Sequence, residues 1–223
     1  MTREKLFTDC RQQFPSLQRM LNGRPVAYFD GPAGTQVPAR VIDALVDYLR
    51  RCNANHGGLF LTSRESDARL DAAHAALADF VGTADPDEIA FGPNMTTLTF
   101  ALSRALARTW RPGDEVIVTR LDHDANFSPW QLAARDAGAT LRIVDINPQD
   151  GTLQLDQFRG LLNNHTRLVA VGCASNSVGT LNPVQQMTQW AHEVGAQVFL
   201  DAVHYAPHGL IDVRSWGCDY LAC

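Results

Sequence analysis

The chain has 223 residues, of which 45% are hydrophobic and 19% are charged, so it is long enough to bury one sizeable core or two small ones. Its formal net charge is -5 at pH 7 and its arginines form no basic stripe, which argues against nucleic acid or an anionic membrane as a partner. No apolar run is long enough to cross a bilayer, and the first ten residues lack the apolar core of a signal peptide. We therefore expect a soluble, cytoplasmic protein that acts on small molecules.

Five cysteines are spread along the chain without a Cys-x-x-Cys pair. The sequence therefore indicates neither a disulfide framework nor a zinc site, and we expect no bound metal. Lys5 is the only lysine, whereas arginine occurs eighteen times.

Residues 1–40 are predicted to form an N-terminal arm and loop, because the segment Tyr28–Pro38 (YFDGPAGTQVP) is dense in glycine and proline. Residues 41–49 carry apolar side chains at spacings of three and four, which predicts a helix with one apolar face. Residues 53–61 break that pattern. A second helix is predicted from about Ser63 to Val81.

From Asp87 onward, short apolar runs alternate with helical stretches, a pattern typical of βαβ units and a mainly parallel sheet. The predicted strands are Glu88–Phe91, Glu115–Thr119, Leu141–Ile146, Leu168–Ala174, Gln197–Ala202 and Asp219–Cys223. The predicted helices are 95–109, 126–137, 155–163 and 183–194. Because no linker interrupts the pattern, residues 41–223 are predicted to form a single α/β domain with helices flanking the sheet.

The segment Gln197–His204 (QVFLDAVH) organises the functional prediction. Its continuous apolar run, residues 198–200, suits a strand buried on both faces of a parallel sheet. Asp201 then lies at the carboxyl end of that strand, where open α/β sheets bind ligands. A carboxylate at this position can also simply begin a turn or cap a helix.

Two other predicted strands end in polar segments. The first leads through GPNMTT into a helix, so that Met95 and Thr96 begin a helix whose N–H groups suit a phosphate, although threonines there also act as plain caps. The second ends in LDHDAN, so that His123 lies between two aspartates. A histidine there can be a metal ligand, an acid/base, a stacking ring or simply a solvated loop residue. Neither segment is a Walker loop or a G-x-G-x-x-G motif, so a nucleotide-binding domain lacks its fingerprint.

Two further candidates follow the fourth and fifth predicted strands. Asn176, in SNSVGT, can direct its amide at a ligand or serve only the turn. His204 and His208 have the i, i+4 spacing of a helical metal pair, but Pro207 makes such a helix unfavourable.

These segments together resemble a known family. YFDGPAGTQVP, NANHGG, LDHDAN, SNSVGTLNPV, FLDAVH and VRSWGCDYLAC are similar, in this order, to the N-terminal part of the class V aminotransferases, fold type I pyridoxal-phosphate enzymes that include the cysteine desulfurases. The resemblance covers nearly the whole chain. It implies the large domain of a transferase or lyase that binds pyridoxal 5'-phosphate (PLP), acts on an amino acid and forms a homodimer, in which residues 53–58 serve a neighbouring subunit's site.

The resemblance also assigns roles to the strand-end residues. It implies that Met95 and Thr96 bind the cofactor phosphate, and that His123 stacks on the pyridine ring and can shuttle protons. It implies that Asp201 pairs with the protonated ring nitrogen, which keeps the ring electron-withdrawing. Asn176 is expected to hydrogen-bond the ring hydroxyl oxygen. His204, where many relatives carry glutamine, is expected to donate a hydrogen bond near the same oxygen.

The sequence departs from the family pattern at its end. The family's lysine, which forms a Schiff base with the cofactor, is expected a few residues beyond Cys223, and Lys5 lies in the arm and matches nothing in that motif. The small C-terminal domain, with its substrate-binding arginine and the desulfurase cysteine, is also absent from the sequence. We therefore expect a chain truncated before the cofactor lysine and inactive alone.

Three hypotheses for the function follow. The first is cysteine desulfurase-like or related β-elimination chemistry in the full-length parent, with transamination as its alternative. The second is a non-catalytic fragment that binds the cofactor or a partner subunit without turnover. The third is a nucleotide-binding α/β domain unrelated to this family.

Overall fold

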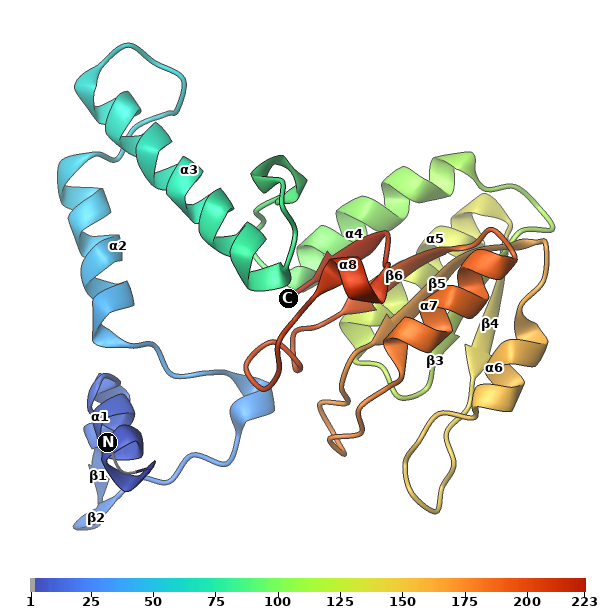
Figure 1. Cartoon of the computed structure of the whole chain (residues 1–223), viewed down its shortest axis with the longest axis horizontal. Coiled ribbons are helices and arrows are strands. Elements are labelled where there is room, and N and C mark those ends of the chain that lie inside the picture. The colour runs from blue at the N-terminus through green and yellow to red at the C-terminus, as the bar shows by residue number, and fades with distance from the viewer. Residues whose placement is uncertain (1–2) are drawn as a thin grey trace. The chain divides into compact units, whose positions relative to one another are not determined.

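The computed structural model describes residues 3–223, and the chain divides into two compact units (Figure 1). The first unit ends at His74, and the second covers Ala75–Cys223. Helix α3 (Leu61–Val81) runs through the boundary. None of the helices in the described part of the chain is long and apolar enough to span a membrane.

The first unit consists of helices and one short hairpin. In chain order it contains helix α1 (Arg3–Gln12), the hairpin of β1 (Met20–Leu21) and β2 (Arg24–Pro25), and helix α2 (Ala39–Arg51). The helix predicted over residues 41–49 is confirmed. Its apolar face is exposed rather than buried, with side chains between 37% and 60% exposed. The single-turn 3-10 helices of this unit are η1 (Pro15–Gln18) and η2 (Gly31–Ala33).

The second unit is built on a five-stranded parallel sheet, as the sequence predicts. In spatial order, its strands are β4 (Thr140–Val144), β3 (Glu115–Thr119), β5 (Thr166–Gly172), β6 (Gln197–Asp201) and β7 (Tyr220–Ala222). Each lies within two residues of its predicted bounds. The α/β fold class is therefore confirmed.

Helices cover both faces of this sheet. In chain order they are α4 (Met95–Leu106), α5 (Ser128–Ala137), α6 (Leu155–Leu161), α7 (Val184–Glu193) and α8 (Val213–Trp216). Leu200 packs in one core cluster with residues of α6 and α7. Phe199, its neighbour in β6, packs in the other with residues of α4 and α5. Because successive strand side chains point to opposite faces, burial on both faces explains the continuous apolar run.

The predicted strand Glu88–Phe91 is wrong. The 3-10 helix η3 (Pro86–Glu88) occupies its start, and the following residues are not part of the sheet, which ends at β7. Ile89 has an extended backbone, with φ -91° and ψ 126°. An extended segment becomes a strand only when its N–H and C=O groups pair with a neighbour, and apolar composition alone does not supply that neighbour.

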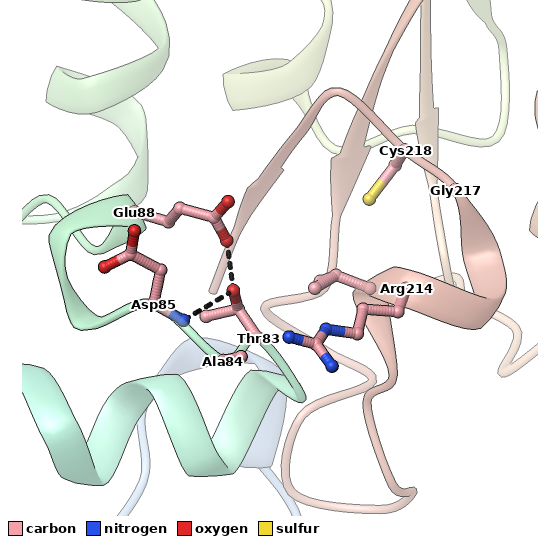
Figure 2. A pocket seen from close by; sticks show the side chains of 8 residues that line it. Thr83, Ala84, Asp85, Glu88, Arg214, Gly217 and Cys218 are labelled. Atoms are coloured by element: carbon pink, nitrogen blue, oxygen red, sulfur yellow. Dashed lines mark hydrogen bonds between the residues drawn. The ribbon is translucent and has the colours of Figure 1, made fainter.

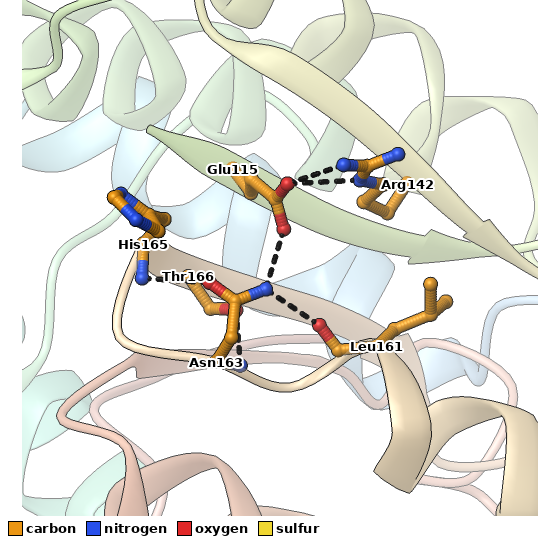
Figure 3. Close-up of polar contacts among 6 residues, drawn as sticks. All are labelled: Glu115, Arg142, Leu161, Asn163, His165 and Thr166. Carbon is orange, nitrogen blue, oxygen red and sulfur yellow. Dashed lines mark hydrogen bonds and ion pairs between the residues drawn. The ribbon is translucent and has the colours of Figure 1, made fainter. Parts of the chain in front are cut away.

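Buried polar contacts fix the amino ends of the strands. Glu115 at the start of β3 accepts hydrogen bonds from Arg142 Nε at 3.0 Å and from Asn163 Nδ2 at 2.8 Å (Figure 3). The hydrogen bond from Arg142 holds the pKa of Glu115 below its usual value, against the opposing effect of burial. Beside it, Asp114 pairs with Arg167 Nε at 2.8 Å. These contacts join β3, β4 and β5 at the amino ends of the strands, whereas the candidate site lies at their carboxyl ends.

Candidate functional site

The carboxyl ends of β3, β5 and β6 meet helix α4 and the 3-10 helix η5 (Asp124–Asn126) at one edge of the sheet. This arrangement follows from the parallel strands, whose carboxyl ends share an edge. Met95 of α4 and Ala125 of η5 pack in the same core cluster. Four of the segments that the sequence singles out therefore converge here, from α4, β3, β5 and β6.

Helix α4 begins with a well-formed cap. Asn94 Oδ1 accepts a hydrogen bond from the Thr97 N–H at 2.9 Å, as expected of an N-cap residue. Met95 is 7% exposed and anchors the first turn in the core, whereas Thr96 is exposed. The remaining first-turn N–H groups have no acceptor within the helix. Together with the helix dipole, they suit an anion.

His123 follows β3 and caps η5. Its Nδ1 accepts a hydrogen bond from the Ala125 N–H at 3.1 Å. An accepting Nδ1 places the proton of the neutral ring on Nε2. The side chain is exposed, so the ring is available to a ligand while its orientation is set by its own turn.

Asp201 is the last residue of β6 and is 9% exposed. Its Oδ1 accepts a hydrogen bond from the Val203 N–H at 3.0 Å, and Oδ2 accepts none from the residues that the structure describes. Burial raises the pKa of Asp201, and the Val203 hydrogen bond and the imidazoles of His123 and His204 act in the opposite direction without cancelling the rise. The structure therefore brings together a buried carboxyl and two imidazoles.

The other two sequence candidates have contrasting surroundings. His204 is half-buried, and its ring lies edge-on to that of His208, with centroids 5.5 Å apart. Asn176 is in the turn after β5, which Ser175 Oγ stabilises by accepting hydrogen bonds from two N–H groups. No described contact joins Asn176 to Asp201. Its role in the site stays a prediction.

The sequence did not predict a role at this site for Asp122, Asn126 and Trp130. Asp122, beside His123, accepts hydrogen bonds from the Thr119 hydroxyl at 2.5 Å and from Asn126 Nδ2 at 3.0 Å. Asn126 in turn accepts one from Trp130 Nε1 at 2.9 Å. The spacing of four between Asp122, Asn126 and Trp130 is the signal that a helical turn brings such side chains together.

The cysteines near the site are not activated. Burial raises the pKa of Cys173, and the neighbouring Asp201 raises it further. Desolvation and the negative charge of Asp201 also raise the pKa of Cys223, which follows β7 at the same end of the sheet. Because the thiolate is the nucleophile, these neutral thiols are poorly suited to attack. Within residues 3–223, no group of three or more His, Cys, Asp or Glu side chains is arranged to hold a metal.

A separate hollow of about 320 Å³ lies near the amino end of β7. Figure 2 shows Thr83, Asp85, Glu88 and Arg214 around it. Thr83 Oγ1 donates a hydrogen bond to Glu88 Oε2 and accepts a weaker one from the Asp85 N–H at 3.4 Å. Several of its polar groups therefore bind one another rather than point at a ligand. It lies away from the strand-end site.

Comparison with known proteins places this geometry in a family. The model of the class-V aminotransferases matches residues 27–223, and the chain belongs to that family. A cysteine desulfurase of Dickeya dadantii is 36% identical over 214 residues, covering 95% of this chain and 52% of that protein. One of Cronobacter sakazakii is 37% identical over 217 residues, covering 94% and 52%. The chain thus spans about half the length of the curated relatives it matches.

Solved structures support the same fold. The apo structure of a cysteine desulfurase from Thermococcus onnurineus NA1 has a TM-score of 0.87 at 26% identity, and covers 96% of this chain and 52% of that chain. The cysteine desulfurase CsdA of Escherichia coli has a TM-score of 0.82 at 27% identity, with coverage of 96% and 53%. The fold is therefore that of the PLP-dependent fold type I enzymes, as the sequence predicts.

Proposed function

We propose that this chain is the cofactor-binding part of a PLP-dependent enzyme that acts on an amino acid. The observation that carries the proposal is the position of Asp201, a buried carboxyl group at the carboxyl edge of the sheet, with Oδ1 held by a backbone N–H and two imidazoles nearby. A carboxylate in this setting can keep a proton on the nitrogen of a pyridine ring. When bound, PLP withdraws electrons from the bonds of an amino-acid substrate.

The groups around Asp201 fit the rest of the cofactor. The first-turn N–H groups of α4, at Met95 and Thr96, suit a phosphate. The His123 ring, oriented through Nδ1, suits stacking on the pyridine and can hold or move a proton at Nε2. For the ring hydroxyl oxygen we propose Asn176 and His204, an assignment that the family resemblance supports. Each role is carried by a side chain or N–H group already present in the chain.

For the longer protein, we propose cysteine desulfurase-like or related β-elimination chemistry. The relatives named above are cysteine desulfurases, which supports this choice over transamination. The pKa values of Cys173 and Cys223, the thiols beside the site, are both raised, so the proposal does not assign the sulfur-accepting cysteine to this chain. The expected location is the cytoplasm.

Cofactor-induced stabilisation tests the proposal. PLP at about 100 times its dissociation constant stabilises a folded protein by about 2.7 kcal/mol, which corresponds to a rise in Tm of roughly 5–10 °C for a chain of this size. NAD at the same concentration is the control and is expected to leave Tm unchanged. The variant Asp201→Ala is expected to lose most of the PLP effect. A rise with NAD but not with PLP would instead support a nucleotide-binding domain.

A second candidate is a fragment that binds PLP without turnover. The observation that favours it is that Lys5, the only lysine of this sequence, lies in α1 and in none of the strand-end segments that form the site. In this case, PLP binds reversibly, is removed by dialysis, and leaves no covalent adduct after borohydride reduction. A borohydride-stable adduct on Lys5 would contradict it.

We also propose a homodimer in which the apolar face of α2 is an interface. The exposed side chains of that face are Val41, Ile42, Leu45, Val46 and Leu49. Large exposed apolar patches are typical of association sites. Light scattering is expected to give a dimer mass for the wild type and a monomer mass for Leu45→Glu, while Arg50→Glu on the same helix stays dimeric. We likewise propose that residues 1–40 form an N-terminal arm and that residues 53–58 contribute to the site of the neighbouring subunit.

A further inference from the structure

The carboxyl group of Asp122 closes the turn that presents His123. It accepts a hydrogen bond from Thr119, the last residue of β3, and another from Asn126, the last residue of η5. Thr119 is 1% exposed and Asn126 is fully buried. The Asp122 side chain therefore connects both ends of the turn. Its partners are buried, and a buried group that loses its hydrogen-bond partner destabilises the fold.

The same network extends to the strand of Asp201. Trp130 donates to Asn126, and its ring lies edge-on to Phe199 with centroids 5.1 Å apart. Phe199 precedes Asp201 by two residues in β6. The orientation of the His123 turn and the position of Asp201 thus depend on one set of buried contacts.

Asp122 also approaches Asp201 at the end of β5. Between the two carboxyl-bearing residues lies Gly172, the Cα partner of Asp201 in the parallel pairing of β5 and β6. A Cβ on Gly172 would stand 2.9 Å from Asp122 Oδ1. Glycine therefore leaves the Asp122 carboxyl room at this position. Two carboxyl groups in a buried setting oppose each other's ionisation.

Burial raises the pKa of Asp122 to about 7. The hydrogen bonds from Thr119 and Asn126 act against this rise, and the negative charge of Asp201 adds to it. The Asp122 carboxyl therefore titrates in the neutral range, far above the usual value of an aspartate.

The other titratable groups favour charge on Asp201 rather than on Asp122. The imidazoles of His123 and His204 stabilise the Asp201 anion, whereas no cation is among the groups that shift Asp122. Cys173 faces both carboxyl groups, and its thiol stays neutral because burial raises its pKa. Neighbouring imidazoles therefore support negative charge on Asp201 and not on Asp122.

We propose that Asp122 is a positioning residue of this site, which ties the His123 turn through Thr119 and Asn126 while the negative charge of the carboxyl pair resides on Asp201, beside the imidazoles of His123 and His204. The proposal rests on the proposed function, in which that charge is assigned to the cofactor ring nitrogen. A protonated Asp122 can donate to the Thr119 hydroxyl while still accepting from Asn126. The turn then keeps both hydrogen bonds without a second buried charge.

The first test uses the full chain without PLP and compares the wild type with Asp122→Asn. Because the folded-state pKa of Asp122 lies above its unfolded value, the folded chain binds more protons between about pH 4 and pH 7, and stability falls as pH rises through that range. From pH 5 to pH 8, the Tm of the wild type is expected to fall by roughly 5–10 °C more than that of Asp122→Asn. Parallel pH profiles would overturn the charge assignment.

The second test measures PLP affinity at pH 6, below the pKa of Asp122, by absorbance titration of variants shown to be folded by circular dichroism. Asp122→Ala removes both ties and is expected to weaken binding by about tenfold, whereas the neutral isostere Asp122→Asn stays within about threefold of the wild type. Equal affinity of all three proteins would overturn the positioning role. If Asp122→Ala does not fold, Thr119→Val replaces it, with an expected weakening of about threefold.

The two tests separate the failure of this proposal from the failure of the proposed function. A wild-type chain that binds no PLP contradicts the proposed function and with it the role of Asp122 toward the cofactor. The pH profile, measured without cofactor, reports on the carboxyl pair alone. The combination of Asp122→Asn with Asp201→Asn completes a double-mutant cycle, in which additive Tm shifts would contradict the interaction between the two carboxyl groups.

Discussion

Gly172 lies against Asp122 so closely that a methyl group on its Cα would stand 2.9 Å from the Asp122 Oδ1 atom. Both sides of this contact are fixed, because Gly172, the last residue of β5, is paired with Asp201 of β6, and the Asp122 carboxyl accepts hydrogen bonds from Thr119 and Asn126. We expect Gly172→Ala to destabilise the fold by about 1–3 kcal/mol, the usual cost of overpacking. Urea denaturation measures the change, with PLP titration to show whether the site moves with it.

Gly160 provides the matched control for this substitution. It lies in α6, and a Cβ there meets nothing within 4 Å. Gly160→Ala is expected to stabilise the protein by roughly 0.5–1 kcal/mol, because alanine favours the helix. A Gly172→Ala variant as stable as Gly160→Ala would show that the Asp122 carboxyl can move away at no cost.

The buried Glu115 links β3 to Arg142 of β4 and to Asn163 before β5. Glu115→Ala is expected to cost about 1–3 kcal/mol at pH 7, because Asn163 and Arg142 lose a charged acceptor. Since the pKa of Glu115 is lowered in the folded state, its contribution is present above the unfolded value near 4.5 and is lost as pH falls through the lower folded value. Urea denaturation at pH 7 and pH 3 measures the effect.

The control for Glu115 is an exposed ion pair. Asp136 pairs with Arg135 at 2.9 Å, and both side chains are more than two-thirds exposed. Asp136→Ala is expected to change stability by less than about 0.5 kcal/mol at either pH, because such pairs are screened by solvent. A Glu115→Ala variant with the same small effect at both pH values would argue against a structural role for its charge.

Sequence patterns predicted the sheet well where burial dictates the composition. Residues 116–118 of β3 are fully buried, so that strand shows a continuous apolar run between turn signals. The segment 88–91 has a similar composition but is not part of the sheet, because pairing depends on a neighbour elsewhere in the fold. The amino-acid composition of a segment indicates whether it is buried and extended. It does not indicate which other strand pairs with that segment.

The same distinction holds for the site. The proximity of Asp201 and His123 was predictable because parallel strands bring their carboxyl ends to one end of the sheet, which follows from topology. The bonds of Asp122 depend on side-chain directions within one turn and on the absence of a side chain at Gly172. Three-dimensional packing, rather than strand order, makes those contacts.

We expect Trp130 to contribute to stability and to PLP binding through a single hydrogen bond as well as through its size. Its Nε1 donates to Asn126 Oδ1 at 2.9 Å, and both residues are fully buried. Trp130→Phe leaves that amide oxygen without its donor, and we expect a loss of about 1–3 kcal/mol together with weaker PLP binding. The comparison is Trp190→Phe, in α7, whose indole is only partly buried against the other core cluster. Equal PLP affinity in the two variants would contradict a link between Asn126 and the site.

Asn94 allows the cap of α4 to be separated from its proposed anion site. Asn94→Ala removes the acceptor for the Thr97 N–H and is expected to cost about 1 kcal/mol. Serine and aspartate are both good N-cap residues, so Asn94→Ser and Asn94→Asp are expected to retain most of the stability.

The two capping variants differ in charge, and this difference tests where the cofactor phosphate binds. A carboxylate at residue 94 stands at the start of the helix whose first-turn N–H groups are assigned to the phosphate, and it repels a second negative group there. We expect Asn94→Asp to weaken PLP binding by about tenfold at low ionic strength, and by less as added salt screens the charges. Asn94→Ser is expected to bind PLP like the wild type. If Asn94→Asp bound PLP as tightly as Asn94→Ser in 10 mM salt, the phosphate would have to bind away from α4.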